Sequence, residues 1–204
     1  MILPDLSYET RLRQKGFKNI IGIDEVGRGS WAGPLVAAGV ILPKSFKIPQ
    51  GLRDSKLVAK KKRIELAILI RTSCLSYFIA EIPSVVINKV GIVQSTQIAF
   101  LKIVNKINIK PDYILLDAFK IKDLPKENQN AIIHGDQISA SIAAASIIAK
   151  VYRDNLMKLF AKQFPIYQFE KNMGYGTKDH QNAIQKFGFC DIHRTGYNLN
   201  YLFT

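Results

Sequence analysis

Cysteine and tryptophan are scarce in this chain of 204 residues, which has two cysteines and one tryptophan. Cys74 and Cys190 lie far apart in the sequence and in no metal-ligand spacing, so we expect neither a disulfide framework nor a zinc site. Two reduced core thiols in a cytoplasmic protein are the simpler interpretation. The first residues lack a basic segment followed by an apolar run, which predicts no signal peptide. Charged or polar residues interrupt every long apolar stretch, so we expect no membrane-spanning segment.

Acidic residues are also few, with 16 aspartates and glutamates against 29 lysines and arginines, and the net charge is +13. Such a charge does not specify a fold, but it favours an anionic partner, either nucleic acid or an acidic membrane surface. Hydrophobic residues make up 48% of the chain, which is enough for a sizeable core. Neither repeats nor a flexible linker interrupt the sequence, so we expect one domain over residues 1–204.

Apolar runs bounded by glycine, proline and polar residues predict strands, and longer periodic stretches predict helices. We expect strands at residues 19–24, 35–42, 75–82, 113–116 and 131–133. We expect helices at residues 59–74, 92–107, 139–164 and 177–187, with Gly91 breaking a helical stretch that opens after Pro83. This alternation predicts an α/β fold in which helices pack on a mixed sheet, and the two early strands indicate an antiparallel start.

Three of the expected strands run directly into carboxylates. Asp24 and Glu25 end the first, Asp117 ends the fourth, and Asp136 follows the fifth. If these strand ends are neighbours in one sheet, the acids converge and repel, and a bound cation relieves the repulsion. Ligands that are all oxygen favour Mg²⁺ or Mn²⁺ over Zn²⁺. The alternative is that these acids are ordinary turn residues, with Asp136 capping the helix that follows.

An ordered set of motifs extends over nearly the whole chain. It comprises residues 23–29 (Ile-Asp-Glu-Val-Gly-Arg-Gly), 32–38, 52–56, 117–118, 135–136, 142–151, 153–154, 174–177, His180 and 193–194. In composition and order this set resembles the ribonuclease HII family. The related ribonuclease HIII usually has Gly-Thr-Gly at residues 27–29 and an added N-terminal domain, so Arg28 and the short N-terminus both favour type HII.

The resemblance implies a ribonuclease H-like mixed sheet flanked by helices, with a C-terminal helical segment over about residues 165–204 that contacts substrate. It implies an endonuclease that hydrolyses the RNA strand of RNA–DNA hybrids and cuts on the 5′ side of single ribonucleotides in duplex DNA. Two Mg²⁺ or Mn²⁺ ions would act there and leave 3′-hydroxyl and 5′-phosphate ends. The family's catalytic and metal-binding acids correspond to Asp24, Glu25, Asp117 and Asp136.

The resemblance also implies substrate contacts from Gly27, Arg28 and Gly29 and from Tyr175, which would sense the RNA–DNA junction. From the residues alone, the glycines form either a tight turn or a close approach to a ribose 2′-hydroxyl. The side chain of Tyr175 is either a core ring or a junction reader.

Four further residues are candidates for a role in the site or in the fold. Ser55 and Lys56 either begin a helix, with Asp54 or Ser55 as its cap, or hold a phosphate. Arg194 is predicted to contact phosphate. His180 is predicted to make a structural hydrogen bond rather than to shuttle protons. Departures from the family pattern occur at residues 30–31, 134 and 196–197, and none of them replaces an expected metal ligand.

Two other functions remain open at this stage. One is a non-catalytic nucleic-acid-binding protein on the same fold, which the positive charge supports equally well. The other is a metal-dependent nuclease of this fold that cuts all-DNA substrates. We expect the partners to be RNA–DNA hybrid and ribonucleotide-containing duplex DNA, with no membrane, and we expect a monomeric protein in the cytoplasm.

Overall fold

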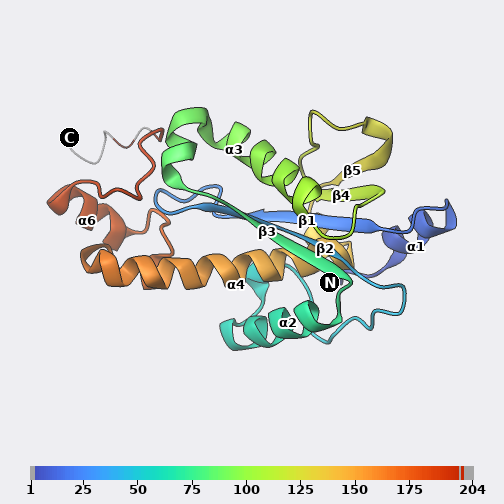
Figure 1. Cartoon of the computed structure of the whole chain (residues 1–204). Helices are drawn as coiled ribbons and strands as arrows, with labels where there is room; N and C mark the ends of the chain where they lie inside the picture. Colours follow the sequence, from blue (N-terminus) through green and yellow to red (C-terminus); the bar gives the residue numbers. More distant parts are fainter. Residues whose placement is uncertain (1–2, 198, 200–204) are drawn as a thin grey trace.

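A five-stranded mixed sheet forms the centre of the molecule in the computed structural model, which describes residues 3–197 and 199 (Figure 1). The strand order is β3-β2-β1-β4-β5. The strands are β1 (Ile20–Val26), β2 (Leu35–Ile41), β3 (Ser76–Ile82), β4 (Tyr113–Asp117) and β5 (Gln129–Ile132). The first three pair antiparallel, whereas β1, β4 and β5 run parallel. The predicted α/β class and the antiparallel start are therefore confirmed.

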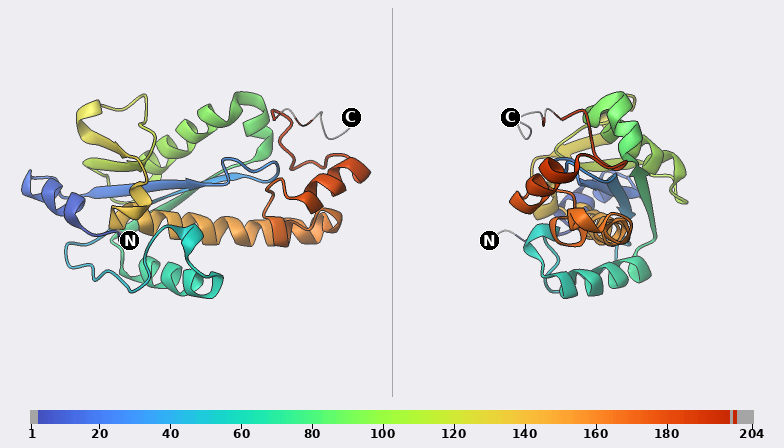
Figure 2. Two further views of the ribbon diagram at one scale, coloured as in Figure 1. Left: turned by 180° about the vertical axis from the view of Figure 1, so that it is seen from behind. Right: turned by 90° about the vertical axis from the view of Figure 1, so that its left-hand side faces the viewer.

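Helices cover both faces of this sheet, as the two views in Figure 2 show. On one face, α4 (Ala140–Gln163) lies along β1 and β2, and α2 (Lys60–Ser73) packs against α4. On the other face, α3 (Ser84–Lys106) lies along β2 and β3. Every residue of β2 is buried, because a strand with helices on both faces needs apolar side chains in both directions.

The alanine-rich first half of α4 lets that helix lie very close to β1. Residues 140–149 are all buried. A Cβ atom built on Gly22 of β1 would lie 2.2 Å from the backbone carbon of Ser141, so only glycine fits there. The small side chains of α4 and the glycine of β1 together allow this close packing.

The sequence analysis expects no membrane-spanning segment, but helix α3 meets the length and hydropathy criteria for one. Among the described residues it is the one helix long and apolar enough to span a membrane by length and composition alone, which is weak evidence for a span because core helices pass the same test. Its helical geometry is broken at Gly91, where φ is 78° and ψ is 163°, as the sequence predicts. Residues such as Ala99, Phe100 and Ile103 are fully buried in the core between α3 and the sheet.

Short elements surround this core. Helix α1 (Ser7–Gln14) precedes β1, and the 3-10 turns are η1 (Ser55–Leu57), η2 (Lys126–Asn128), η3 (Gly135–Gln137) and η4 (Pro165–Tyr167). After α4 the chain forms α5 (Phe169–Asn172) and α6 (Lys178–Phe187). The strand expected at residues 131–133 begins two residues earlier, at Gln129, and the 3-10 turns and α5 were not foreseen. Residues 198 and 200–204 of the expected C-terminal segment lie outside the described residues.

Candidate active site

Four carboxylates from three neighbouring strand ends line one cavity. Since β1, β4 and β5 are parallel, with Ile23 paired to Leu116 and Asp117 to Ile132, their C-terminal ends meet at the same edge of the sheet. This edge carries the four acids, which line a cavity of about 260 Å³ and are Asp24, Glu25, Asp117 and Asp136. The structure therefore brings together the acids that the strand pattern predicts to converge.

Burial disfavours the charged form of the two acids on β1. The side chain of Asp24 is 6% exposed, and its pKa is raised well above the usual value by burial and by the neighbouring charges of Glu25 and Asp117. Burial raises the pKa of Glu25 to about 7, with Asp117 adding to the effect and Arg28 opposing it. Burial and like charge thus shift both groups toward the protonated form, and positive charge in the cavity would shift them back.

The other two acids are held by the turn after β5. The carboxylate of Asp117 accepts the backbone N–H of Gly135 at 2.8 Å, and burial raises the pKa of Asp117. Burial followed by the charge of Asp54 raises the pKa of Asp136 to about 6. Asp136 lies in η3, whereas the hydroxyl of Ser139 caps α4 by accepting the N–H of Ile142 at 3.3 Å. The alternative role of Asp136 as the cap of α4 is therefore wrong.

Asp54 is a fifth acid at this site, and the sequence analysis treated it only as a helix cap. It does cap η1, because its carboxylate accepts the N–H of Lys56 at 2.9 Å. Its side chain also makes a hydrogen bond to Asp136. No local pattern indicates this contact, since Asp54 precedes η1 and its partner is distant in the sequence.

The donor chemistry of the cavity suits a hard divalent cation. All of the converging side chains present oxygen, and Glu25 Oε2 is buried without a hydrogen-bond partner. In the part of the chain that the structure describes, no three histidine, cysteine, aspartate or glutamate side chains already stand as a metal-binding group. The residues fit a metal ion in type and location.

Residues 27–29 form the loop that leaves β1 and lines the same cavity. Gly27 has φ 83°, and a Cβ there would lie 2.1 Å from Nε of Arg153, so the fold itself requires glycine. Gly29 is exposed, and a Cβ there would meet nothing within 4 Å. The guanidinium of Arg28 stacks on the ring of Phe119 at 4.0 Å, a partner that the sequence analysis missed.

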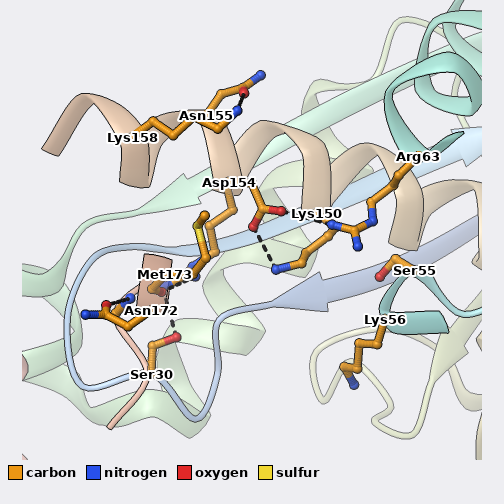
Figure 3. Close-up of polar contacts among 12 residues, drawn as sticks. Ser30, Ser55, Lys56, Arg63, Lys150, Asp154, Asn155, Lys158, Asn172 and Met173 are labelled. Atoms are coloured by element: carbon orange, nitrogen blue, oxygen red, sulfur yellow. Dashed lines mark hydrogen bonds and ion pairs between the residues drawn. The ribbon is translucent and has the colours of Figure 1, made fainter. Parts of the chain in front are cut away.

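Ser55 and Lys56 of η1 also line the cavity. The hydroxyls of Ser55 and Ser146 are 3.0 Å apart, and Ser146 also makes a hydrogen bond to Asp24. Lys56 is exposed, and Figure 3 shows its side chain extending from η1 below Ser55. Although burial opposes its charge, the carboxylates of Asp54, Asp24 and Asp136 raise the pKa of Lys56. Lys56 is thus a cation beside the acids.

Tyr175 lines the cavity from the C-terminal segment and is half-buried. The guanidinium carbon of Arg153 lies 5.7 Å from the centre of the tyrosine ring. The N–H of Tyr175 donates to the carbonyl of Asn172 at 2.9 Å, and its own carbonyl accepts the N–H of Thr177 at 2.8 Å. The ring is therefore mounted on a tightly hydrogen-bonded loop rather than sealed within the core.

Arg194 does not make the phosphate contact predicted for it. Its side chain is fully buried, where Nε donates to the carbonyl of Gly33 and Nη1 to the carbonyl of Arg28, both at 3.0 Å. A guanidinium used in this way holds the loop after β1 and is closed to solvent. The prediction is wrong because charge in a sequence does not reveal that backbone carbonyls will surround it.

Arg153 of α4 is a second buried arginine with the same task. It donates to the carbonyls of Pro34 at 2.9 Å and Met173 at 2.8 Å, and to the hydroxyl of Ser30 at 2.8 Å. Asp154 forms its ion pairs with Arg63 at 3.0 Å and Lys150 at 2.7 Å, as Figure 3 shows. Arg153 thereby ties the loop after β1 to the loop that carries Tyr175.

Comparison with known proteins places this geometry in a family. A model of the ribonuclease HII family matches residues 21–200. The structure is similar to ribonuclease H2 from Pyrococcus horikoshii OT3, with TM-score 0.70 and 21% identity over 88% of this chain and 94% of that chain. It is similar to the RNase HII that is in complex with PCNA from Archaeoglobus fulgidus, with TM-score 0.75 and 23% identity over 89% and 96% of the two chains. A third similar structure is Bst-RNase HIII in complex with Mn²⁺, with TM-score 0.61 and 20% identity over 84% of this chain and 63% of that chain.

At these identities the similar structures show the fold alone, whereas the family match extends over most of the sequence. It includes the strand-end acids, the loop after β1 and the segment that carries Tyr175. On this evidence the chain belongs to the ribonuclease HII family.

Proposed function

We propose that this protein is a divalent-metal-dependent endonuclease. It hydrolyses the RNA strand of RNA–DNA hybrids and cuts on the 5′ side of single ribonucleotides in duplex DNA, leaving 3′-hydroxyl and 5′-phosphate ends. Family membership supports ribonuclease H activity in general. The observation that carries the finer proposal is the convergence of four carboxylates, two of them buried, in one cavity that residues 27–29, Lys56 and Tyr175 also line.

Asp24, Glu25, Asp117 and Asp136 are the residues that would hold two Mg²⁺ or Mn²⁺ ions. Bound divalent ions would supply the positive charge that activates water and stabilises the leaving 3′-oxygen. The raised pKa values of these acids support the proposal, since burial and mutual repulsion of this kind are relieved by cations.

The remaining cavity residues have substrate roles in this proposal. The exposed backbone at Gly29 leaves room for a ribose to approach closely, because no side chain of the protein occupies that space. Lys56 supplies a cation that can pair with a phosphate beside the acids. Tyr175 presents a ring and a hydroxyl at the rim, where it would read the junction between RNA and DNA.

The test is a cleavage assay on three duplexes of the same sequence: an RNA–DNA hybrid, a DNA duplex with one ribonucleotide, and an all-DNA duplex. Each is incubated with Mg²⁺, with Mn²⁺, and with a chelator, and the ends are identified by ligation and by 5′-phosphate analysis. We expect cleavage of the first two duplexes only, with metal only, and with a cut 5′ of the ribonucleotide.

Two results would contradict the proposal. Tight binding of all duplexes without cleavage in either metal would indicate a non-catalytic binding protein. Equal cleavage of the all-DNA duplex would indicate a nuclease that does not read the ribose.

A further inference from the structure

Two histidines, brought together from separate parts of the C-terminal segment, are fully or almost fully buried beside the candidate active site. His180 is 0% exposed on α6, and His193 is 1% exposed in the loop that follows α6. Their Nε2 atoms are 3.0 Å apart. In Figures 1 and 2 this segment lies against the end of α4, away from the sheet core. No metal role is available to the pair, because each remaining ring nitrogen already faces the protein's own backbone.

The partners of the rings determine where the protons are. His180 Nδ1 lies 2.9 Å from the carbonyl of Tyr175, so Nδ1 must donate, and His180 Nε2 is left as an acceptor. The N–H of Cys190 donates to His193 Nδ1 at 2.8 Å, a shorter contact than the 3.2 Å from Nδ1 to the carbonyl of Cys190, so Nδ1 accepts and His193 carries its proton on Nε2. His193 Nε2–H can then donate to His180 Nε2. The result is one directed chain from Cys190 through both rings to the Tyr175 carbonyl.

The chain requires both imidazoles to be neutral, and their surroundings favour this. Burial lowers the pKa of His180, and burial together with His180 lowers the pKa of His193 to about 4. The titratable neighbours are Tyr167, whose ring centre is 4.8 Å from that of His193, and the thiol of Cys190. Burial raises the pKa of both neighbours, so they too are neutral near pH 7.

The residues at the Cys190 end of this hydrogen-bond chain also hold the loop after β1. Next to His193, the N–H of Arg194 donates to the carbonyl of Trp31, and the side chain of Arg194 donates to the carbonyls of Gly33 and Arg28. Residues 190–194 therefore contact one recognition element through Arg194 and the other through the histidines. We propose that the hydrogen-bond chain through His180 and His193 has a positioning role. It holds Tyr175 at a fixed position relative to the Gly27–Gly29 loop.

This inference rests on the proposed function, because Tyr175 must read substrate for its position to matter. Two substitutions each interrupt the hydrogen-bond chain at a different place. His180→Gln retains an amide that can accept from His193 but loses the ring nitrogen that reaches the Tyr175 carbonyl. His193→Asn retains an acceptor for the Cys190 N–H but is too short to reach His180. Ile184→Val is the control, because Ile184 is fully buried on the same helix as His180, in the apolar cluster that includes Tyr167, but has no polar group.

The experiment measures kcat/KM on the duplex with one ribonucleotide, in the wild-type background and in a Tyr175→Ala background, with thermal melting of every variant. We expect each histidine variant to lower kcat/KM by about tenfold, the effect of one lost hydrogen bond at the upper end of the usual range. The double histidine variant should have a kcat/KM no lower than that of either single variant. In the Tyr175→Ala background, neither histidine substitution should lower kcat/KM further. Ile184→Val should leave kcat/KM unchanged.

Three results would overturn the inference: unchanged kcat/KM in His180→Gln, an equal loss in the Tyr175→Ala background, or the same selective loss in Ile184→Val. Because His180→Gln keeps its partner for His193, it remains informative if His193→Asn does not fold. Failure of the proposed function is distinct from all three, since it appears as a wild-type protein that does not cleave, or as a Tyr175→Ala variant that cleaves like wild type.

Discussion

The acid edge of the sheet and the C-terminal segment both bury charge, but they compensate it differently. None of the four acids at the sheet edge forms an ion pair with a residue that the structure describes, and they open onto a cavity. Arg153 and Arg194 also lack a carboxylate partner among those residues, yet backbone carbonyls surround them and they are 0% exposed. Unsatisfied charge that faces a cavity is available to a ligand, whereas the arginines are committed to holding two loops.

The strongest test of this comparison removes one charge from the sheet edge. Asp136→Asn keeps the shape of the side chain and should lower cleavage by more than about a hundredfold, the usual effect of losing one group that stabilises transition-state charge. Hybrid binding should persist or tighten, because one negative charge facing phosphate is gone. Cleavage rate and hybrid affinity are both measured, and a variant that cleaves near the wild-type rate would remove Asp136 from the site.

The matching change in the other region is Arg153→Met, which keeps length and loses the charge and the donors. The carbonyls of Pro34 and Met173 and the hydroxyl of Ser30 would lose buried partners. At about 1–3 kcal/mol for each unsatisfied buried group, we expect the free energy of unfolding to fall by about 3 kcal/mol or more. Chemical denaturation measures it. A variant as stable as wild type would show that the arginine does not hold the loops.

Two glycines of one loop are expected to be needed for different reasons: Gly27 for folding and Gly29 for binding the substrate. Gly27→Ala meets Arg153 and a positive φ, so we expect a loss of about 1–2 kcal/mol in stability. Gly29→Ala meets nothing within 4 Å, so it should melt like wild type and yet cleave the ribonucleotide-containing duplex poorly. Melting and cleavage are compared for the pair. Normal cleavage by Gly29→Ala would show that the ribose does not approach the backbone at Gly29.

The smallest expected effect is a pH-dependent stabilisation by metal. The pKa values of Glu25 and Asp136 are raised from 4.5 and 3.8 to about 7 and about 6 in the folded protein. The folded state therefore binds more protons than the unfolded chain, and the stability that these acids contribute is complete below about pH 4 and is lost as pH rises through 6 and 7. We expect Mg²⁺ to raise the melting temperature more at pH 8 than at pH 6.5.

The comparison between pH 6.5 and pH 8 lies above the range in which His180 and His193 matter, because their lowered pKa values make stability fall only as pH drops below about 6.5. The control is NaCl at matched ionic strength, and Asp136→Asn should show a smaller response to Mg²⁺. An equal Mg²⁺ effect at both pH values would indicate that the cation does not bind at the acids.

Sequence patterns predicted the sheet region well, because its information is local. Short β-branched runs ending in Asp24, Asp117 and Asp136 indicate strands that present acids at their ends, and parallel pairing then places those ends together. The strand at β5 was misplaced by two residues, since its short polar sequence has weak strand character. The roles of Gly29 and Tyr175 remain predictions that rest on the family resemblance, and that of Lys56 remains a prediction that rests on its charge.

The C-terminal segment was predictable only as helices, because its important contacts join residues that no periodicity relates. By itself the sequence determined which strands form and that they end in acids, since hydrophobic alternation and turn residues act over a few positions. Only the tertiary structure decided that Arg194 holds a loop instead of phosphate, that Asp54 faces Asp136, and that His180 meets His193. Each of these side chains is polar, and a buried polar group takes whichever partner the packed chain brings within hydrogen-bonding distance.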